Sequence, residues 1–347
     1  MPKKQALQRC DDTIFAHTKS RRAKVLVTGV SGFTGSNLAM ALIKKGYEVH
    51  GFVRAGSKVS NIDPSKIALH RGDLGDAKAV EDAVKGMDLV YHIAASYRES
   101  GAPDSEYYKV NVDGTRYLLE ASLKRGVKRF IHCSTVGVHG HVKNPPADET
   151  APFSPGALYQ KTKILGEEVV QEYMKKGLKA VIFRPVGIYG PGDRRFLKPF
   201  KGVKKGRFLM FGSGEILYHL TFIDDLVEGI ILCGEHANAP GKIYIIAGEK
   251  ATTLNELVQR IAAELKVSPP KIKIPFWILY AASVLWESAC KPFGINPPLF
   301  RRRADFFRKD RSFNTAKIRS ELGYQPKVSL EEGIRRTSEW YRAENLI

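Results

Sequence analysis

The chain has 347 residues, of which 43% are hydrophobic and 26% charged, as in globular proteins with one large α/β domain or two lobes. Its four cysteines lie far apart without paired spacing, which argues against a disulfide framework or zinc site and favours a reducing compartment. The formal net charge of +19 concentrates in residues 1–24, 191–210 and 289–320. No nucleic-acid recognition motif accompanies it, so we expect an anionic ligand, an anionic membrane surface or a solvated face, and no nucleic acid.

The first 22 residues are basic and lack the apolar stretch that a secretory signal needs. We expect residues 1–22 to form a disordered basic extension. The cytoplasm is therefore the expected location.

A glycine loop follows the first apolar run, Val25 to Val27, and opens a helical pattern. Glycines allow a tight turn and a close approach to a pyrophosphate, which then lies on the free N–H groups of the helix. This strand–turn–helix context predicts dinucleotide binding. The candidate contact residues are Gly29, Ser31, Gly32, Phe33, Thr34 and Gly35.

The residues after the second predicted strand, 48–53, bear on cofactor choice. A carboxylate there would bind the adenosine ribose of NAD, but Arg54 occupies the position. Arg54, with Lys58, would pair with a 2′-phosphate through charge-assisted hydrogen bonds. We therefore favour NADP(H), while NAD(H) stays open because an arginine at a strand end can be merely solvated.

Residues 23–184 alternate short apolar runs with helical stretches, which predicts a doubly wound parallel α/β sheet of Rossmann type. The predicted strands are 24–28, 48–53, 67–70, 88–93, 129–134 and 179–184. The pattern becomes irregular in residues 185–347, where we expect a smaller, discontinuous C-terminal lobe. A strand near 243–247 would return to the sheet, and Thr253 would cap a helix over 253–265.

Tyr159 and Lys163 lie four residues apart in a helical stretch and so share one face. An ammonium beside a phenol favours the phenolate and lowers the pKa of the tyrosine, which suits proton transfer near neutral pH. With 14 tyrosines in a lysine-rich chain, the spacing alone could arise by chance. The order of the surrounding motifs favours a catalytic Tyr–Lys pair over a chance occurrence of this spacing.

That order resembles the extended short-chain dehydrogenase/reductase family, also called the NAD-dependent epimerase/dehydratase family, from Ala23 onward. Its dihydroflavonol-reductase and 3β-hydroxysteroid-dehydrogenase-like branch is the most similar. Besides the two motifs above, the resemblance depends on Gly72–Leu74, His92–Ala95, Asn111–Thr115, Ser134–Thr135, Arg184–Asp193 and Thr221–Leu226.

The resemblance implies the following site. Asp73 receives the adenine edge, Ala94 and Ala95 line the nicotinamide side, and Lys163 holds the ribose. A hydroxyl, that of Thr135 or alternatively Ser134, orients a ketone while Tyr159 supplies the proton. The implied cofactor site also includes Leu74, Tyr159, Pro185 and Val186.

The substrate class stays open between two readings. Members that act on nucleotide sugars commonly have an asparagine where this chain has Gly187, so we favour a hydrophobic steroid-, lipid- or flavonoid-like ketone or alcohol. Residues 211–214 and 218–225 instead resemble the sugar-epimerase branch, and the basic stretches would suit a nucleotide diphosphate. The alternative is therefore a nucleotide-sugar 4-epimerase or dehydratase with retained NAD. A dinucleotide-binding regulator without activity usually lacks the Tyr or the Lys.

Residues 274–286 form a strongly apolar segment that is shorter than the ~20 residues of a membrane-spanning helix. We expect a helix that caps the substrate pocket and contacts a membrane interface through residues 274–290; an ordinary buried helix is the alternative. The resemblance is also compatible with a homodimer formed through helices beside the Tyr-x-x-x-Lys motif.

Overall fold

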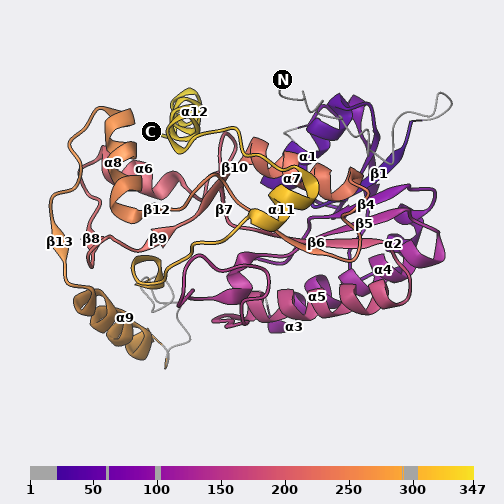
Figure 1. Cartoon of the computed structure of the whole chain (residues 1–347), viewed down its shortest axis with the longest axis horizontal. Helices are drawn as coiled ribbons and strands as arrows, with labels where there is room; N and C mark the ends of the chain where they lie inside the picture. Colours follow the sequence, from indigo (N-terminus) through magenta and orange to yellow (C-terminus); the bar gives the residue numbers. More distant parts are fainter. Residues whose placement is uncertain (1–21, 60–61, 98–102, 291, 293–303) are drawn as a thin grey trace, which may run out of the picture.

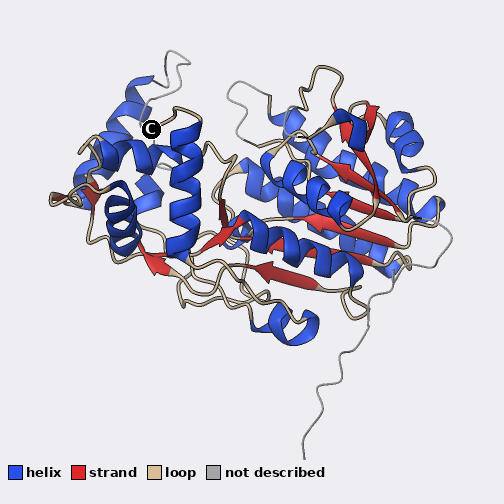
Figure 2. Ribbon diagram, turned by 90° about the horizontal axis from the view of Figure 1, so that it is seen from above, coloured by secondary structure: helices blue, strands red, loops and turns tan. Residues whose placement is uncertain are grey.

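The computed structural model describes residues 22–59, 62–97, 103–290, 292 and 304–347, so the predicted N-terminal extension lies almost wholly outside the described residues. Figures 1 and 2 show two lobes, one built on a large sheet and one mainly helical. The sheet lobe carries most of the predicted site.

Seven parallel strands form the sheet, in the order β11-β6-β5-β4-β1-β2-β3. The predicted doubly wound α/β sheet is confirmed, and the first six strands match their predicted ranges to within one residue at either end. The seventh, β11, pairs with β6 at the sheet edge. The strands are β1 (Lys24–Thr28), β2 (Glu48–Val53), β3 (Ala68–Arg71), β4 (Leu89–His92), β5 (Arg129–Cys133), β6 (Ala180–Pro185) and β11 (Ile243–Ile246).

Helices cover both faces of the sheet because successive strand residues point to opposite sides. In β1, Val25 and Val27 belong to one buried cluster and Leu26 to another. The first cluster includes residues of α1 (Phe33–Lys44) and α7 (Ile223–Glu235), and the second includes residues of α2 (Ala77–Val84), α4 (Gly114–Lys124) and α5 (Leu158–Lys175) (Figure 1).

Short elements beside these helices complete the sheet lobe. A π-helical turn, Lys109–Asp113, joins α3 to α4, and single 3-10 turns lie at Pro64–Lys66 and Val136–His139. Two further helices are α3 (Asp104–Tyr108) and α11 (Ala316–Leu322).

The second lobe is assembled from segments of the C-terminal half. Its α8 begins as predicted, because the Thr253 hydroxyl accepts a hydrogen bond of 3.1 Å from the N–H of Glu256. The remaining elements are β7 (Gly187–Tyr189), α6 (Leu197–Lys204), β8 (Met210–Phe211), β9 (Leu217–Tyr218), β10 (Leu220–Phe222), β12 (Thr252–Thr253), α8 (Leu254–Leu265), β13 (Lys273–Ile274), α9 (Phe276–Cys290), a 3-10 turn (Asp305–Phe307) and α12 (Leu330–Ala343).

Helix α9 covers the apolar segment singled out in the sequence. The alternative of an ordinary buried helix is wrong, because the side chains of Trp277 and Leu285 are 69% and 70% exposed. Among the residues that the structure describes, every helix is too short or too polar to cross a membrane.

A buried ion pair connects the strand and the helix that flank the predicted catalytic residues. Arg184 of β6 and Glu167 of α5 form a two-pronged contact of 2.6 and 2.9 Å, and both side chains are at most 2% exposed. Arg184 also donates to the carbonyl of Glu149 and contacts Nε2 of His139. Glu167 accepts a hydrogen bond from the Ser134 hydroxyl. The pair therefore fixes α5 against the end of β5.

Replacement of one partner leaves the other buried and uncompensated. We expect Glu167→Ala to lower the free energy of unfolding by about 3–5 kcal/mol, measured by urea denaturation. The control is Glu332→Ala in the exposed ion pair with Arg335 on α12, which should change it by less than ~1 kcal/mol. Equal effects of the two substitutions would contradict a structural role for the buried pair.

Candidate active site

The glycine loop between β1 and α1 approaches neighbouring backbone too closely for side chains. Gly29 has a φ of +70°, and a Cβ there would lie 2.8 Å from the backbone nitrogen of Ala94. A Cβ on Gly35 would lie 2.2 Å from the carbonyl oxygen of Gly29. Both positions therefore require glycine.

The start of α1 suits an anion. Gly32 is the N-cap residue and has no side chain to cap the helix, and the first turn contains no acidic residue. Ser31 and Gly32 are exposed, whereas Phe33 and Thr34 are half-buried. The N–H groups of a helix start, with the glycines beside them, fit the diphosphate of a dinucleotide.

Thr28, the last residue of β1, holds the segment that follows β4. Its hydroxyl accepts hydrogen bonds of 3.1 Å from the N–H groups of both Ile93 and Ala94, and it contacts Nδ1 of His92 at 2.8 Å. Burial lowers the pKa of His92 to about 3, so the imidazole is neutral. Ala94 and Ala95 are thereby placed directly beside the glycine loop.

Three basic residues end or follow the neighbouring strands β2 and β3. Arg54 and Lys58 are exposed after β2, and Arg71 ends β3 with its guanidinium donating to the carbonyl of Ala55 at 3.0 Å. The sequence analysis did not include Arg71 in the cofactor site. Its position at the end of a predicted strand was a signal that could have indicated it, because β3 pairs with β2. Clustered guanidinium and ammonium groups suit an anion such as a phosphate.

Asp73 lies near this cluster, with Leu74 buried beside it. A hydrogen bond from the N–H of Gly75 lowers the pKa of Asp73, and Lys109, 3.2 Å away, and Arg54 lower it further. The carboxylate is therefore charged at neutral pH and can accept hydrogen bonds.

Tyr159 and Lys163 lie one turn apart at the start of α5. The ring of Tyr97, from the segment after β4, meets the Tyr159 ring edge-on with centroids 4.6 Å apart. The buried Lys163 Nζ lies 3.4 Å from Nε2 of His132 on β5. Both candidate residues therefore lie at the same sheet edge as the glycine loop.

The pKa of Tyr159 differs from the sequence-based expectation. Burial raises it well above its ordinary value, and Cys133 and Tyr97 add to the rise while Arg195 opposes it. The expectation that Lys163 lowers this pKa is wrong for the chain alone, because desolvation dominates. Burial lowers the pKa of Lys163 itself. Tyr159 is thus a phenol that keeps its proton.

The two candidate hydroxyls after β5 have different surroundings. Ser134 is buried and donates to Glu167 within the ion-pair network. Thr135 is half-buried, and its hydroxyl accepts a hydrogen bond of 3.0 Å from the N–H of Gly137. A hydroxyl that accepts from the backbone retains its own proton for donation. Thr135 is therefore the better placed of the two to bind a substrate oxygen.

Pro185 and Val186 follow Arg184 at the end of β6 and are both buried. The N–H of Val186 donates to the carbonyl of Ile246 at 3.2 Å. A Cβ on the next residue, Gly187, would lie 2.8 Å from the Leu220 side chain. The nearest atom is the flexible end of that side chain, so a larger residue at this position would displace a Leu220 methyl group.

Two further residues contact the segments that form the site at the carboxyl edge of the sheet, namely Asn111 and Arg195. The buried Asn111 accepts from the N–H of Ser96 at 2.8 Å and donates to the Thr162 hydroxyl at 3.0 Å, so it joins the segment after β4 to α5. Arg195 lies over the Phe33 ring, 5.7 Å from its centroid. Sequence reasoning missed Arg195, which the adjacent Asp193 holds through a bond of 2.7 Å.

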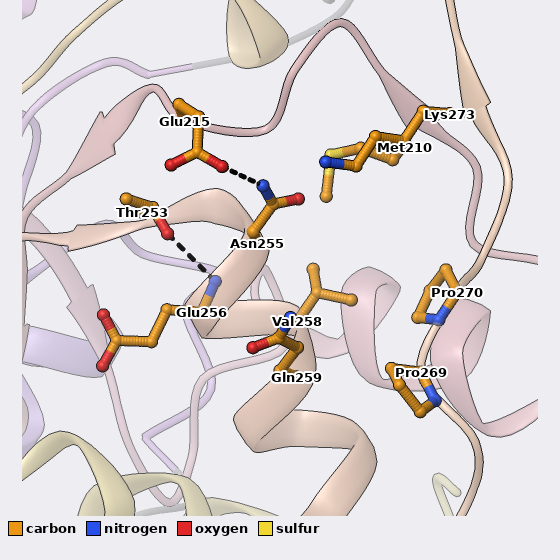
Figure 3. A pocket seen from close by; sticks show the side chains of 10 residues that line it. All are labelled: Met210, Glu215, Thr253, Asn255, Glu256, Val258, Gln259, Pro269, Pro270 and Lys273. Atoms are coloured by element: carbon orange, nitrogen blue, oxygen red, sulfur yellow. Dashed lines mark hydrogen bonds between the residues drawn. The ribbon is translucent and has the colours of Figure 1, made fainter.

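A pocket of about 430 Å³ lies away from these residues, in the second lobe (Figure 3). Polar side chains from the start of α8 and from the segment before β9 line it, together with two prolines. They include Glu215, Thr253, Asn255, Pro269 and Pro270. It contains none of the predicted catalytic or cofactor-binding residues.

The fold and the site together define a class of enzyme. A parallel sheet of Rossmann order places a glycine loop at a helix start and a Tyr–Lys pair at the same edge. These features are typical of enzymes that use a bound nicotinamide dinucleotide.

The chain belongs to the NAD dependent epimerase/dehydratase family, whose model matches residues 25–247. It is 31% identical over 335 residues to a 3-beta-hydroxysteroid dehydrogenase of Mycolicibacterium neoaurum, covering 92% of this chain and 91% of the relative. It is 32% identical over 327 residues to a 2-alkyl-3-oxoalkanoate reductase of Stenotrophomonas maltophilia, covering 90% and 98%. A UDP-glucose 4-epimerase of Thermotoga maritima, solved with UDP-glucose, superimposes with a TM-score of 0.76 at 26% identity, covering 93% and 99%. The chain is therefore an NAD-dependent enzyme of this family that acts on small molecules.

The glycine loop provides a direct test of dinucleotide binding. We expect Gly29→Ala to weaken NAD(P)H binding at least about tenfold, because the residue needs a positive φ and a Cβ would meet Ala94. Fluorescence titration of the nicotinamide measures the change. Gly202→Ala on α6 is the control, since its Cβ would make only ordinary contacts of 3.5 Å or more with Phe208. Unchanged binding by the Gly29 variant would contradict the assignment.

Proposed function

We propose that the chain interconverts a ketone and a secondary alcohol on a hydrophobic small molecule, with NADP(H) as the favoured cofactor. The observation that carries the proposal is the placement of Tyr159 and Lys163 on α5, at the sheet edge that also holds the glycine loop. The bound nicotinamide supplies or accepts the hydride.

In this proposal the chain's own groups orient the substrate and move one proton. The Thr135 hydroxyl donates to the carbonyl oxygen of a ketone, and Tyr159 gives its phenolic proton to that oxygen as negative charge develops there. Burial keeps the Tyr159 phenol protonated, which suits the direction of reduction. Lys163 holds the nicotinamide ribose, and Tyr97 excludes water from one side of Tyr159.

The choice of NADP(H) is supported by three cations at the ends of β2 and β3. Arg54, Lys58 and Arg71 lie where the adenosine ribose of a dinucleotide is bound in folds of this kind. A 2′-phosphate would pair with their charges. Binding of NAD(H) by the same site is the alternative, in line with the family.

A hydrophobic substrate is supported by the residues around Gly187. Gly187 lacks the side-chain amide expected for a nucleotide-sugar site, and apolar atoms of Leu220 and Tyr218 lie 2.8 and 3.6 Å from where its Cβ would be. The Tyr218 ring packs edge-on against Phe306, which in turn packs against Phe307. Two of the similar proteins are named as a hydroxysteroid dehydrogenase and an oxoalkanoate reductase, and these names also favour a hydrophobic substrate.

The second candidate is a nucleotide-sugar epimerase or dehydratase that retains NAD. The structural likeness to the UDP-glucose 4-epimerase favours it. Arg311 lies over the Tyr218 ring and would suit a diphosphate, whereas Arg308 and Lys309 form ion pairs with Asp305. The absence of a side-chain amide at Gly187 and the aromatic rings of Tyr218, Phe306 and Phe307 favour the first candidate.

Three further inferences accompany the proposal. Residues 23–184 would serve as the nucleotide-binding domain and residues 185–347 mainly as the substrate lobe. We infer a cytoplasmic location from the absence of paired cysteines. A homodimer stays a prediction.

The phenolic proton can be removed without loss of the ring. We expect Tyr159→Phe to lower kcat for ketone reduction by ~10²–10⁴-fold while cofactor binding persists. Steady-state kinetics with a hydrophobic ketone measure the effect. The control is Tyr173→Phe, a buried tyrosine at the other end of α5. Normal turnover by the Tyr159 variant would refute its role.

Charge reversal at Arg54 tests the cofactor preference. We expect Arg54→Asp to lower the ratio of NADPH to NADH efficiency by about tenfold or more, because it replaces a phosphate-pairing cation by a carboxylate. The ratio of the two kcat/KM values measures this. Lys85→Asp, at the exposed end of α2, is the control for net charge. An unchanged ratio in the Arg54 variant would disprove the preference.

A further inference from the structure

Helix α9 presents a large apolar surface to solvent. We define the α9 face as its exposed large side chains, which are Trp277, Ile278, Tyr280, Leu285 and Trp286. Trp277 and Leu285, the most exposed, are 69% and 70% accessible. A contiguous apolar patch of this kind usually marks an interaction site.

The helix is anchored to the lobe along its other side. Leu279, Ser283 and Cys290 are buried, and a Cβ on Gly212 would lie 3.7 Å from Phe276. The Arg308 guanidinium lies over the rings of Phe276 and Tyr280, at 5.6 and 5.8 Å. In Figure 1, α9 lies at the outer edge of the lobe. Its apolar surface is therefore held in place and directed outward.

The length of α9 decides how it could contact a membrane. Fifteen residues make a helix of about 22 Å, shorter than the ~30 Å hydrocarbon core of a bilayer. The exposed aromatic and aliphatic side chains lie around the part of the helix that faces away from Leu279, Ser283 and Cys290. A short helix with such side chains can lie in the interface plane. Tryptophan and tyrosine prefer the headgroup level.

Charge indicates which surface the α9 face would meet. The exposed Lys271 and Lys273 precede the helix, and Glu287 is its one acidic residue. Arg308 flanks the helix and forms an ion pair of 3.0 Å with Asp305. Anionic headgroups complement such a rim. A second copy of the chain would bring the same formal charge of +19 with it, which opposes self-association.

We propose that the α9 face docks this enzyme on the surface of an anionic lipid bilayer. Trp277 and Leu285 enter the boundary between headgroups and acyl chains, and the flanking cations contact the lipid phosphates. The docking does not depend on the proposed function.

The segment 308–309 has one residue at α9 and the next near the segment that precedes α5. Arg308 touches α9, and the next residue, Lys309, has its Nζ 3.8 Å from a Cβ built on Gly156. Gly156 lies three residues before Tyr159. A hydrophobic substrate accumulates in a membrane, so docking would raise its concentration around the enzyme; this consequence rests on the proposed function.

Vesicle binding by the full chain tests the proposal. Two of the three tryptophans in the chain lie on α9, so a Trp340→Phe background leaves Trp277 and Trp286 as reporters. With equimolar phosphatidylcholine–phosphatidylglycerol vesicles we expect co-sedimentation, a blue shift of tryptophan emission, and quenching by brominated acyl chains. Binding to phosphatidylcholine alone should be weaker.

Substitutions of exposed residues distinguish binding through the α9 face from non-specific binding through other apolar surface residues. We expect Trp277→Ser with Leu285→Ser, in the natural tryptophan background, to lower the vesicle partition coefficient about a hundredfold while NADPH binding is kept. The matched control is Tyr108→Ser with Leu123→Ser, two exposed apolar residues on α3 and α4. Absence of vesicle binding, equal losses in both double variants, or an α9 variant that only dissociates a dimer in analytical ultracentrifugation would overturn the proposal.

Discussion

The buried ion pair between Arg184 and Glu167 is the constraint on which the candidate site depends. It connects β6 to α5, and through Ser134 it also reaches the end of β5. Glu149 extends the network to β11, because its carboxylate accepts from the N–H of Ile245 at 2.8 Å. Two charges at this depth are tolerated only because each is paired and hydrogen-bonded. The start of α5, with Tyr159 and Lys163, is thereby set against the carboxyl edge of the sheet.

This arrangement also buries Tyr159 and so affects its protonation state. The Lys163 ammonium contacts His132 on β5. Burial raises the pKa of Tyr159, so its phenol is protonated in the chain alone. A protonated phenol can serve as a general acid for ketone reduction. The opposing influence of Arg195 shows that the segment after β7 also acts on this group.

Much of the fold could be predicted from the sequence because its signals are local. Apolar runs of β-branched residues gave the strands, and glycine spacing gave the loop before α1. The ion pair could not be predicted, since Glu167 and Arg184 meet through tertiary packing between a helix and a strand. The rise in the pKa of Tyr159 likewise depends on desolvation by residues such as Tyr97, which sequence spacing does not report. For α9 the sequence left an exposed and a buried helix open, because apolar composition does not reveal what covers a helix.

The central claim is that this enzyme exchanges its cofactor in each cycle, as a reductase does, rather than retaining it as an epimerase does. The most direct measurement is titration of the purified chain with NADPH and NADH, combined with native mass spectrometry of the protein as isolated. If the cofactor is exchanged in each cycle, the protein should be isolated without cofactor and bind NADPH more tightly than NADH. Protein isolated with tightly retained NAD would contradict it and favour the nucleotide-sugar epimerase.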